Sequence, residues 1–200
     1  VVVDMPFGSY QGNSKEALNS AIRIMKETGG HAVKLEGGEE IVESVKRILT
    51  AGIPVMGHIG LQPQTTMLSE GYKVQGKTKD AAIKLIEDAK ELEEAGVFSI
   101  ALEMISHEVA QIISETVSVP TIGIGSGVGC NGQILVVQDL LGMFEKIKPK
   151  FAKRYLSLSE EIRNAVKSYV TDVKKGNFPT NKNEFQMDES EYNKLKEEIV

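Results

Sequence analysis

Cysteine is nearly absent from this 200-residue chain, because Cys130 is the only one. A single thiol excludes an internal disulfide and a metal site built from several cysteines, and it is typical of a reducing, cytoplasmic setting. No apolar run approaches the roughly 20 residues that a membrane-spanning helix needs. The net charge is -5 without a block of basic residues, so the electrostatic footprint of a nucleic-acid-binding protein is missing as well. We therefore expect a cytoplasmic protein that binds neither nucleic acid nor membrane.

What remains is the composition of an ordinary globular protein, with 41% hydrophobic and 26% charged residues. The length corresponds to one domain, or to most of one. The chain opens with Val1-Val2-Val3-Asp4, without a methionine and already inside a predicted strand. Because free chain ends usually have a polar lead-in, we expect further sequence upstream of Val1.

The chain repeats a plan of apolar strand, loop, amphipathic helix and glycine. Predicted strands, short and rich in valine and isoleucine, cover residues 1–4, 31–36, 53–58, 97–103, 119–125 and 133–138. Predicted helices cover residues 15–28, 39–50, 79–95, 106–116, 159–175 and 189–200. Strands that alternate with helices are parallel and are joined by right-handed crossovers. The pattern therefore predicts an α/β fold with a parallel sheet.

Two parallel architectures fit this plan, a doubly wound open sheet and a (βα)8 TIM barrel. A complete barrel takes about 250 residues, so six strands and a start inside a strand predict a barrel that lacks its first two strand-helix units. We expect this N-terminally incomplete barrel over residues 1–180 and a charged C-terminal extension over residues 181–200. The long segment 59–76 is predicted to be a functional loop of the kind that often serves as a lid.

Ionisable side chains occur at the carboxyl ends of four successive predicted strands. They are Asp4, Lys34 with Glu36, His58 and Glu103. Lys34 and Glu36 are two residues apart, so both point to the same side of their strand. Buried charges cost several kcal/mol unless they are paired or hold a ligand. Since the active site of a barrel lies at these strand ends, the pattern predicts one shared site.

Each of these residue types suggests a chemical role. The carboxylates of Asp4 and Glu36 suit a hard cation such as Mg²⁺. Lys34 is suited to hold an anionic substrate, and His58 to serve as a hydrogen-bond donor or a base. Glu103 follows an apolar run, which raises a carboxyl pKa and favours a general base. The alternatives left open are strand-end caps and ion pairs for the acids, a Glu103–Lys34 salt bridge, and a histidine satisfied by its local contacts.

Longer motifs surround these residues. They are Asp4-Met5-Pro6-Phe7, VKLEGG at residues 33–38, GHIGLQPQ at 57–64, GYKVQG at 71–76, Leu102-Glu103 and IGIGSG at 122–127. On these motifs, over roughly residues 1–179, the chain resembles the ketopantoate hydroxymethyltransferase family. The resemblance implies a (βα)8 barrel, a homodecamer, and two small-molecule substrates, a ketoacid and a folate. It also implies transfer of a hydroxymethyl group from 5,10-methylenetetrahydrofolate to α-ketoisovalerate, a step of pantothenate and coenzyme A biosynthesis.

The resemblance implies a role for each strand-end residue. Asp4 and Glu36 match the family's magnesium site, and Asp4, Lys34 and His58 match residues that bind the ketoacid or lie near it. Glu103 matches the family's proposed base, which removes the proton from the carbon next to the ketone. The first two strands of the family, with an aspartate-serine pair that contacts metal and ketoacid, have no counterpart in this sequence.

Two other functions fit parts of the pattern. A Mg²⁺-dependent carbon-carbon lyase of the phosphoenolpyruvate mutase type shares the enolate chemistry, but it does not predict the long motifs around His58 and Tyr72. A non-catalytic barrel that only assembles with other chains would account for the absent upstream strands. Metal binding separates this scaffold from either enzyme, and folate dependence separates the transferase from the lyase.

Overall fold

The strands form one parallel sheet in which each strand lies beside the next one in sequence. The computed structural model describes residues 1–66, 72–145 and 148–199. The strands are β1 (Val2–Asp4), β2 (Ala32–Glu36), β3 (Val55–Gly60), β4 (Ser99–Glu103), β5 (Thr121–Ile124) and β6 (Gly132–Gln133), paired in that order. A doubly wound sheet would reverse its strand order at a switch point. The described strands show no reversal, so this α/β sheet is consistent with a partial TIM-type barrel.

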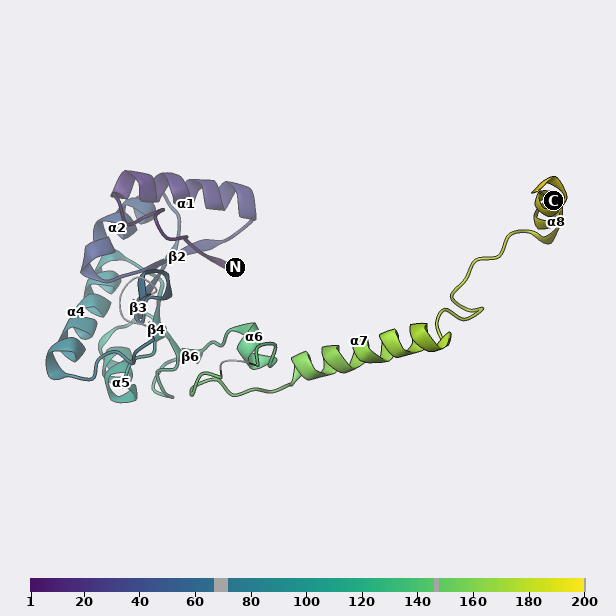
Figure 1. Cartoon of the computed structure of the whole chain (residues 1–200). Helices are drawn as coiled ribbons and strands as arrows, with labels where there is room; N and C mark the ends of the chain where they lie inside the picture. Colours follow the sequence, from purple (N-terminus) through teal and green to yellow (C-terminus); the bar gives the residue numbers. More distant parts are fainter. Residues whose placement is uncertain (67–71, 146–147, 200) are drawn as a thin grey trace. The chain divides into compact units, whose positions relative to one another are not determined.

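Helices follow the strands as the repeating plan predicts. They are α1 (Ser14–Thr28), the 3-10 turn η1 (Glu39–Ile41), α2 (Val42–Thr50), α3 (Pro63–Thr66), α4 (Lys79–Ala95), α5 (His107–Thr116), α6 (Val137–Leu140), α7 (Leu158–Lys175) and α8 (Glu189–Ile199). Figure 1 shows α1, α2, α4 and α5 following one another around the outside of the strands. The ends of α1 have local causes, because the Asn13 side chain accepts a hydrogen bond from the Glu16 N–H and Gly29 adopts a left-handed conformation.

The hydrophobic core lies between these helices and one face of the sheet. Alternate strand residues, including Val33, Leu35, Val55, Ile100 and Leu102, are completely buried. They form one cluster with residues of α1, α2, α4 and α5, among them Ala17, Ala21, Val45, Ile48, Ala89, Leu92, Val109 and Ile113. Each valine, leucine or isoleucine of this cluster contributes about 1.5–3 kcal/mol on burial. The helices therefore cover one face of the sheet, and the residues between the buried ones point to the other.

The sixth strand differs from its prediction. Residues 133–138 were expected to be extended, but β6 covers only Gly132–Gln133, and Val137 begins the short helix α6. A Cβ atom on Gly132 would lie 2.8 Å from Ile122 Cδ1, so the strand pairs closely where no side chain intervenes. Ile134 is 47% exposed, although it is apolar. The prediction for residues 134–138 was wrong because apolar composition does not by itself supply a partner for burial.

Two other predicted segments extend beyond the described residues. The predicted loop 59–76 contains the end of β3 and the helix α3, whereas residues 67–71 lie outside the described part. The predicted tail helix 189–200 corresponds to α8, and its last residue also lies outside the described part.

The chain separates into two compact units, Val1–Val136 and Val137–Val200. The first unit contains the six-stranded sheet and its helices. The second contains α6, α7 and α8, whose described residues are not buried. None of the helices in the described ranges is long and apolar enough to cross a bilayer. The division at residue 180 stays a prediction.

Candidate active site

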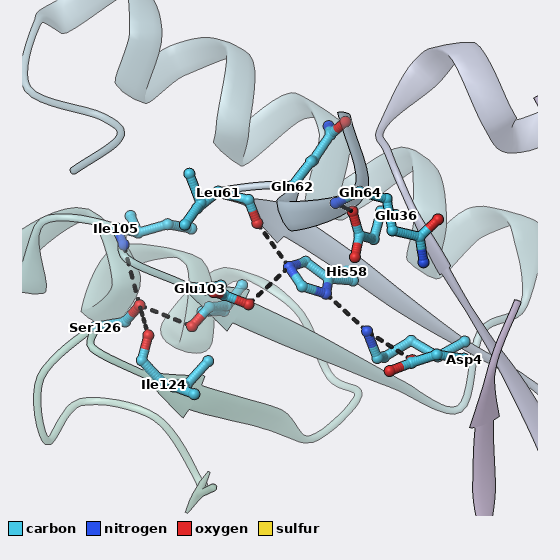
Figure 2. Close-up of polar contacts among 12 residues, drawn as sticks. Asp4, Glu36, His58, Leu61, Gln62, Gln64, Glu103, Ile105, Ile124 and Ser126 are labelled. Carbon is cyan, nitrogen blue, oxygen red and sulfur yellow. Dashed lines mark hydrogen bonds and ion pairs between the residues drawn. The ribbon is translucent and has the colours of Figure 1, made fainter. Parts of the chain in front are cut away.

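The strand register brings the five predicted site residues to one face of the sheet. Asp4 pairs with Lys34 across β1 and β2, Glu36 pairs with His58, and Glu103 lies level with the last residue of β3. Residues in register share a face with each other and with residues two positions away. All five side chains therefore leave the sheet on the face opposite the helices. Figure 2 shows Asp4, Glu36, His58 and Glu103 gathered at the carboxyl ends of the strands.

Lys34 lies between an acid and an imidazole. Its Nζ atom is 2.8 Å from Asp4 Oδ1 and 2.9 Å from His58 Nδ1. The Lys34 side chain is 14% exposed, whereas that of Asp4 is 60% exposed. Because an N–H of the lysine can only donate, His58 Nδ1 accepts. Lys34 is thus a mostly buried donor held in place by two partners.

His58 is neutral at physiological pH, and its tautomer is fixed by its contacts. Nε2 lies 2.8 Å from the carbonyl oxygen of Leu61, which can only accept, so Nε2 carries the proton. Burial, followed by the positive charge of Lys34, lowers the pKa of His58 to about 4. A neutral imidazole that accepts from Lys34 orients the lysine, and His58 is therefore suited to position other groups rather than to supply charge.

Glu103 has the pKa of a base that works near neutral pH. Burial raises the pKa of its carboxyl to about 7, while Lys34 lowers it and the charges of Glu36 and Asp4 raise it. Its Oε2 atom lies 3.4 Å from His58 Nε2. Since His58 is neutral, this is a weak polar contact rather than an ion pair. A carboxyl group of this kind accepts a proton efficiently near pH 7.

Backbone contacts hold the end of β4 in place behind Glu103. The next residue, Met104, has φ of 48°, and it is the single non-glycine residue with positive φ in the described ranges. Both backbone polar groups of Met104 are hydrogen-bonded. The buried hydroxyl of Ser126 donates to Leu102 O at 2.7 Å and accepts from Ile105 N at 3.1 Å (Figure 2). The general-base candidate therefore sits on a constrained backbone.

Glu36 is the most buried carboxylate of the site, with 6% exposure. Burial raises its pKa, and a hydrogen bond from the Gln64 N–H, 3.1 Å from Oε2, lowers it. Lys34 also lowers the pKa of Glu36, and Asp4 raises it. Glu36 is thus held at the carboxyl end of β2 by a contact from the segment that follows β3.

The donor atoms of the site fit a hard divalent cation. Asp4 and Glu36 supply carboxylate oxygens from neighbouring strands. In the part of the chain that the structure describes, no three His, Cys, Asp or Glu side chains form a group able to hold a metal. Zinc sites need three or four such ligands, whereas Mg²⁺ uses one or two carboxylates with water and substrate oxygens. The carboxylate pair therefore fits Mg²⁺ completed by water and substrate.

Two residues that were not predicted as site residues contact Glu36. The Tyr10 hydroxyl accepts from the Glu36 N–H at 3.2 Å, and Gln64 binds the Glu36 carboxylate. Gln64 closes the motif at residues 57–64, and Tyr10 is the one aromatic residue in the polar stretch 8–14. These sequence signals mark the residues, but neither signal indicates which partner they bind.

A family model and similar protein sequences agree on one family. Residues 1–181 match the family model described as ketopantoate hydroxymethyltransferase. A protein of Nitrosopumilus maritimus named 3-methyl-2-oxobutanoate hydroxymethyltransferase is 65% identical over 199 residues, which cover 100% of this chain and 71% of that protein. Proteins with the same name from Syntrophus aciditrophicus and Clostridium botulinum are each 54% identical. Their matches cover 92% and 98% of this chain, and 68% and 71% of those proteins.

Proposed function

Because this chain belongs to the ketopantoate hydroxymethyltransferase family, we propose that it converts α-ketoisovalerate (3-methyl-2-oxobutanoate) into ketopantoate. The hydroxymethyl group comes from 5,10-methylenetetrahydrofolate, and the product enters pantothenate and coenzyme A biosynthesis. The observation that carries this proposal is the geometry of the site, in which the Glu103 carboxylate, with a pKa raised to about 7 by burial, shares one sheet face with Lys34 and two further acids. Such a set combines a base with groups that bind an anion and a cation.

Glu103 is the proton acceptor of the proposed reaction. Its carboxylate removes the proton from the substrate carbon next to the ketone and leaves an enolate. The raised pKa makes this carboxylate a stronger base than an exposed glutamate, and about half of the groups are ionised near pH 7. The enolate carbon then forms a bond to the methylene carbon of the folate, and water supplies the oxygen of the new hydroxymethyl group. Both C–N bonds of that methylene carbon break, and tetrahydrofolate leaves with two protons, one from the substrate carbon by way of Glu103 and one from the water.

Lys34 and His58 orient and neutralise the anionic substrate. The Lys34 Nζ atom already donates to His58 Nδ1, so the lysine is aimed before substrate arrives. A preorganised donor of this kind stabilises charge that develops on an oxygen during the reaction. His58 keeps the donor in place because its own Nε2–H is bound to Leu61 O.

Asp4 and Glu36 would hold Mg²⁺ in this proposal. A bound Mg²⁺ would supply Lewis-acid stabilisation of negative charge on the ketoacid. Asp4 contacts Lys34 at 2.8 Å, so the same carboxylate connects the proposed cation site with the proposed anion site.

The proposal is tested by measuring formation of ketopantoate from α-ketoisovalerate and 5,10-methylenetetrahydrofolate with Mg²⁺. We expect turnover that requires all three components and that stops when EDTA is added in excess. Turnover without the folate would contradict the transferase assignment and favour a lyase. Absence of both turnover and Mg²⁺ binding would favour a scaffold. The family's homodecamer and a cytoplasmic location stay predictions, which light scattering and cell fractionation would check.

A further inference from the structure

Tyr10 and Gln64 form a closed set of hydrogen bonds around Glu36, which we call the Tyr10–Gln64 network. The Glu36 N–H donates to the Tyr10 hydroxyl at 3.2 Å, and this hydroxyl donates to Gln64 Oε1 at 3.2 Å. The Gln64 side-chain amide donates to Met5 O at 2.8 Å, and the Gln64 backbone N–H donates to Glu36 Oε2 at 3.1 Å. The network thus joins the segments that follow β1, β2 and β3.

The direction of every bond in this network is determined by its partners. Met5 O can only accept, so the NH₂ group of Gln64 must face it. The Oε1 atom of Gln64 therefore faces Tyr10 and needs a donor, which the Tyr10 hydroxyl provides. A flipped amide would place two acceptor oxygens 2.8 Å apart at Met5. Burial raises the pKa of Tyr10 to about 12, so its proton is present at neutral pH.

The network is also anchored at its base. Tyr10 is 1% exposed and Met5 is completely buried. The Ser44 hydroxyl, from α2, donates to Tyr10 O at 3.2 Å. Tyr10 therefore has a fixed backbone and a fixed ring, and its hydroxyl is a rigid support for Gln64 and Glu36.

The consequence concerns the two oxygens of the Glu36 carboxylate. Oε2 accepts from the Gln64 backbone, and Figure 2 shows Gln64 beside Glu36. Among the residues that the structure describes, none donates a hydrogen bond to Oε1. One oxygen is thus committed to the protein, and the other remains available to a ligand.

We propose that Tyr10 and Gln64 are positioning residues that make Glu36 a one-oxygen ligand for a divalent cation. The proposal rests on the proposed function, because it takes Glu36 as part of the cation site. Residues that hydrogen-bond to a metal ligand fix its orientation, and their loss typically costs about 10- to 100-fold in metal affinity. Tyr10 and Gln64 act only through Glu36, so their removal should weaken cation binding and leave the chemical step intact.

The direct test is a titration of the purified protein with Mn²⁺. Electron paramagnetic resonance measures the concentration of free Mn²⁺ at each step and so gives the Kd. Tyr10→Phe removes one hydroxyl, and Gln64→Leu removes the amide while keeping the backbone N–H. We expect each variant to raise the Kd for Mn²⁺ by about 10-fold or more. Tyr169→Phe is the matched control, because it deletes the same group from a residue that is 57% exposed on α7, and it should leave the Kd unchanged.

A double variant separates a shared network from two unrelated effects. If the two residues act through one set of bonds, Tyr10→Phe combined with Gln64→Leu should weaken Mn²⁺ binding little more than one change alone. If the losses of Mn²⁺ affinity in the two single variants add up fully in the double variant, Tyr10 and Gln64 do not act through one set of hydrogen bonds. Thermal unfolding of each variant checks the fold, and Gln64→Leu provides an independent reading if Tyr10→Phe unfolds.

Turnover provides the second readout. Raising Mg²⁺ should return the kcat of Tyr10→Phe to that of the wild type, whereas a merely structural defect would not be rescued. Unchanged Mn²⁺ affinity in both variants would overturn this proposal and leave the proposed function standing. Weakened Mn²⁺ binding in a protein without hydroxymethyl transfer would support the network and refute the proposed function. A wild-type protein that does not bind Mn²⁺ would overturn the network's role.

Discussion

Each unit of the chain contains a contact between an acidic and a basic side chain, and the distances alone give a misleading ranking of the two acids as candidate functional groups. In the unit 137–200, Arg163 and Glu145 are 2.6 Å apart with side chains about half exposed. In the unit 1–136, His58 and Glu103 are 3.4 Å apart, with exposures of 3% and 16%. The closer pair lowers the pKa of Glu145, whereas burial raises that of Glu103 to about 7.

The difference teaches that burial, rather than proximity, identifies the chemically useful acid. Water screens an exposed pair, so its net effect on stability is small even at short distance. A carboxyl group removed from water has its pKa changed by desolvation, and such groups cluster at functional sites. The following predictions test this contrast, from the largest expected effect to the smallest.

Replacing Glu103 should have the largest effect. Glu103→Gln keeps the shape of the side chain but removes the base, and we expect kcat to fall about 10²- to 10⁴-fold. The matched control is Glu145→Gln, which changes an exposed acid of the other unit and should leave kcat unchanged. The assay is formation of ketopantoate at saturating substrates. Equal activity in the two variants would remove Glu103 from the mechanism.

The pH dependence should follow the same carboxyl group. Glu103 must be ionised to accept a proton, so kcat/KM should rise with pH and level off above about 7. Well below that pH, activity should fall about tenfold per pH unit, as for a single titrating base. A profile measured from pH 5 to 9 would show this. A plateau that already begins near pH 5 would mean that the pKa of Glu103 is not raised in the working enzyme.

The shift also predicts how Glu103 affects stability. Its folded pKa lies above the ordinary value of 4.5, so between about pH 4.5 and 7 the folded state binds more protons than the unfolded state. The contribution of Glu103 therefore favours folding below pH 4.5 and is lost as pH rises through 7, by up to about 3 kcal/mol. Glu103→Gln should remove this loss, so urea unfolding at pH 8 should show a more stable variant. A less stable variant would contradict the shift.

Two glycine substitutions compare the effect of added volume at a buried position and at an exposed position, without changing a site residue. A Cβ atom on Gly38 would lie 2.0 Å from Oδ1 of the buried Asp88, which accepts from the Glu39 N–H at 3.0 Å. Gly38→Ala should therefore reduce the free energy of unfolding by about 1–3 kcal/mol, as overpacking does. In Gly12→Ala the new Cβ meets only the end of the flexible Glu16 side chain, so that variant should be nearly neutral. Urea titration of both proteins makes the comparison.

The smallest effect should come from the closest pair. Arg163→Gln removes the partner of Glu145 at an exposed site, and we expect no measurable change in Tm or in kcat. Differential scanning calorimetry at low and at high salt would detect a contribution if there were one. A clear drop in Tm at both salt concentrations would show that this pair stabilises the unit more than its exposure suggests.

Much of the first unit is predictable from local signals. The order of strands and helices follows from apolar periodicity, and residues such as Gly29 and Gly96 end their helices in the left-handed conformation that glycine favours. The sixth strand was placed too far along the chain, because Ile134 is apolar but half exposed. Periodicity records what a residue prefers, whereas burial depends on a partner that the local sequence does not contain.

The site shows the same limit. Asp4, Lys34 and Glu103 could be predicted because the ends of parallel strands meet at one edge of a sheet. Tyr10 could not, because its hydroxyl contacts residues 26 and 54 positions away in the chain. Contacts between loops depend on how the loops are placed, and no spacing rule predicts them.

The left-handed backbone of Met104 has a consequence for variation in this protein. A side chain in that conformation costs about 1–2 kcal/mol, and glycine would avoid the cost. Glycine also adds about 0.5–1 kcal/mol of chain entropy to the unfolded state, so Met104→Gly would gain at most about 1 kcal/mol in a screen for thermostability alone. The same change would free the backbone beside Glu103, whose placement the proposed reaction needs. A change that raises stability at this position is therefore expected to lower turnover. Thermostable variants at residue 104 should be assayed for turnover before they are kept.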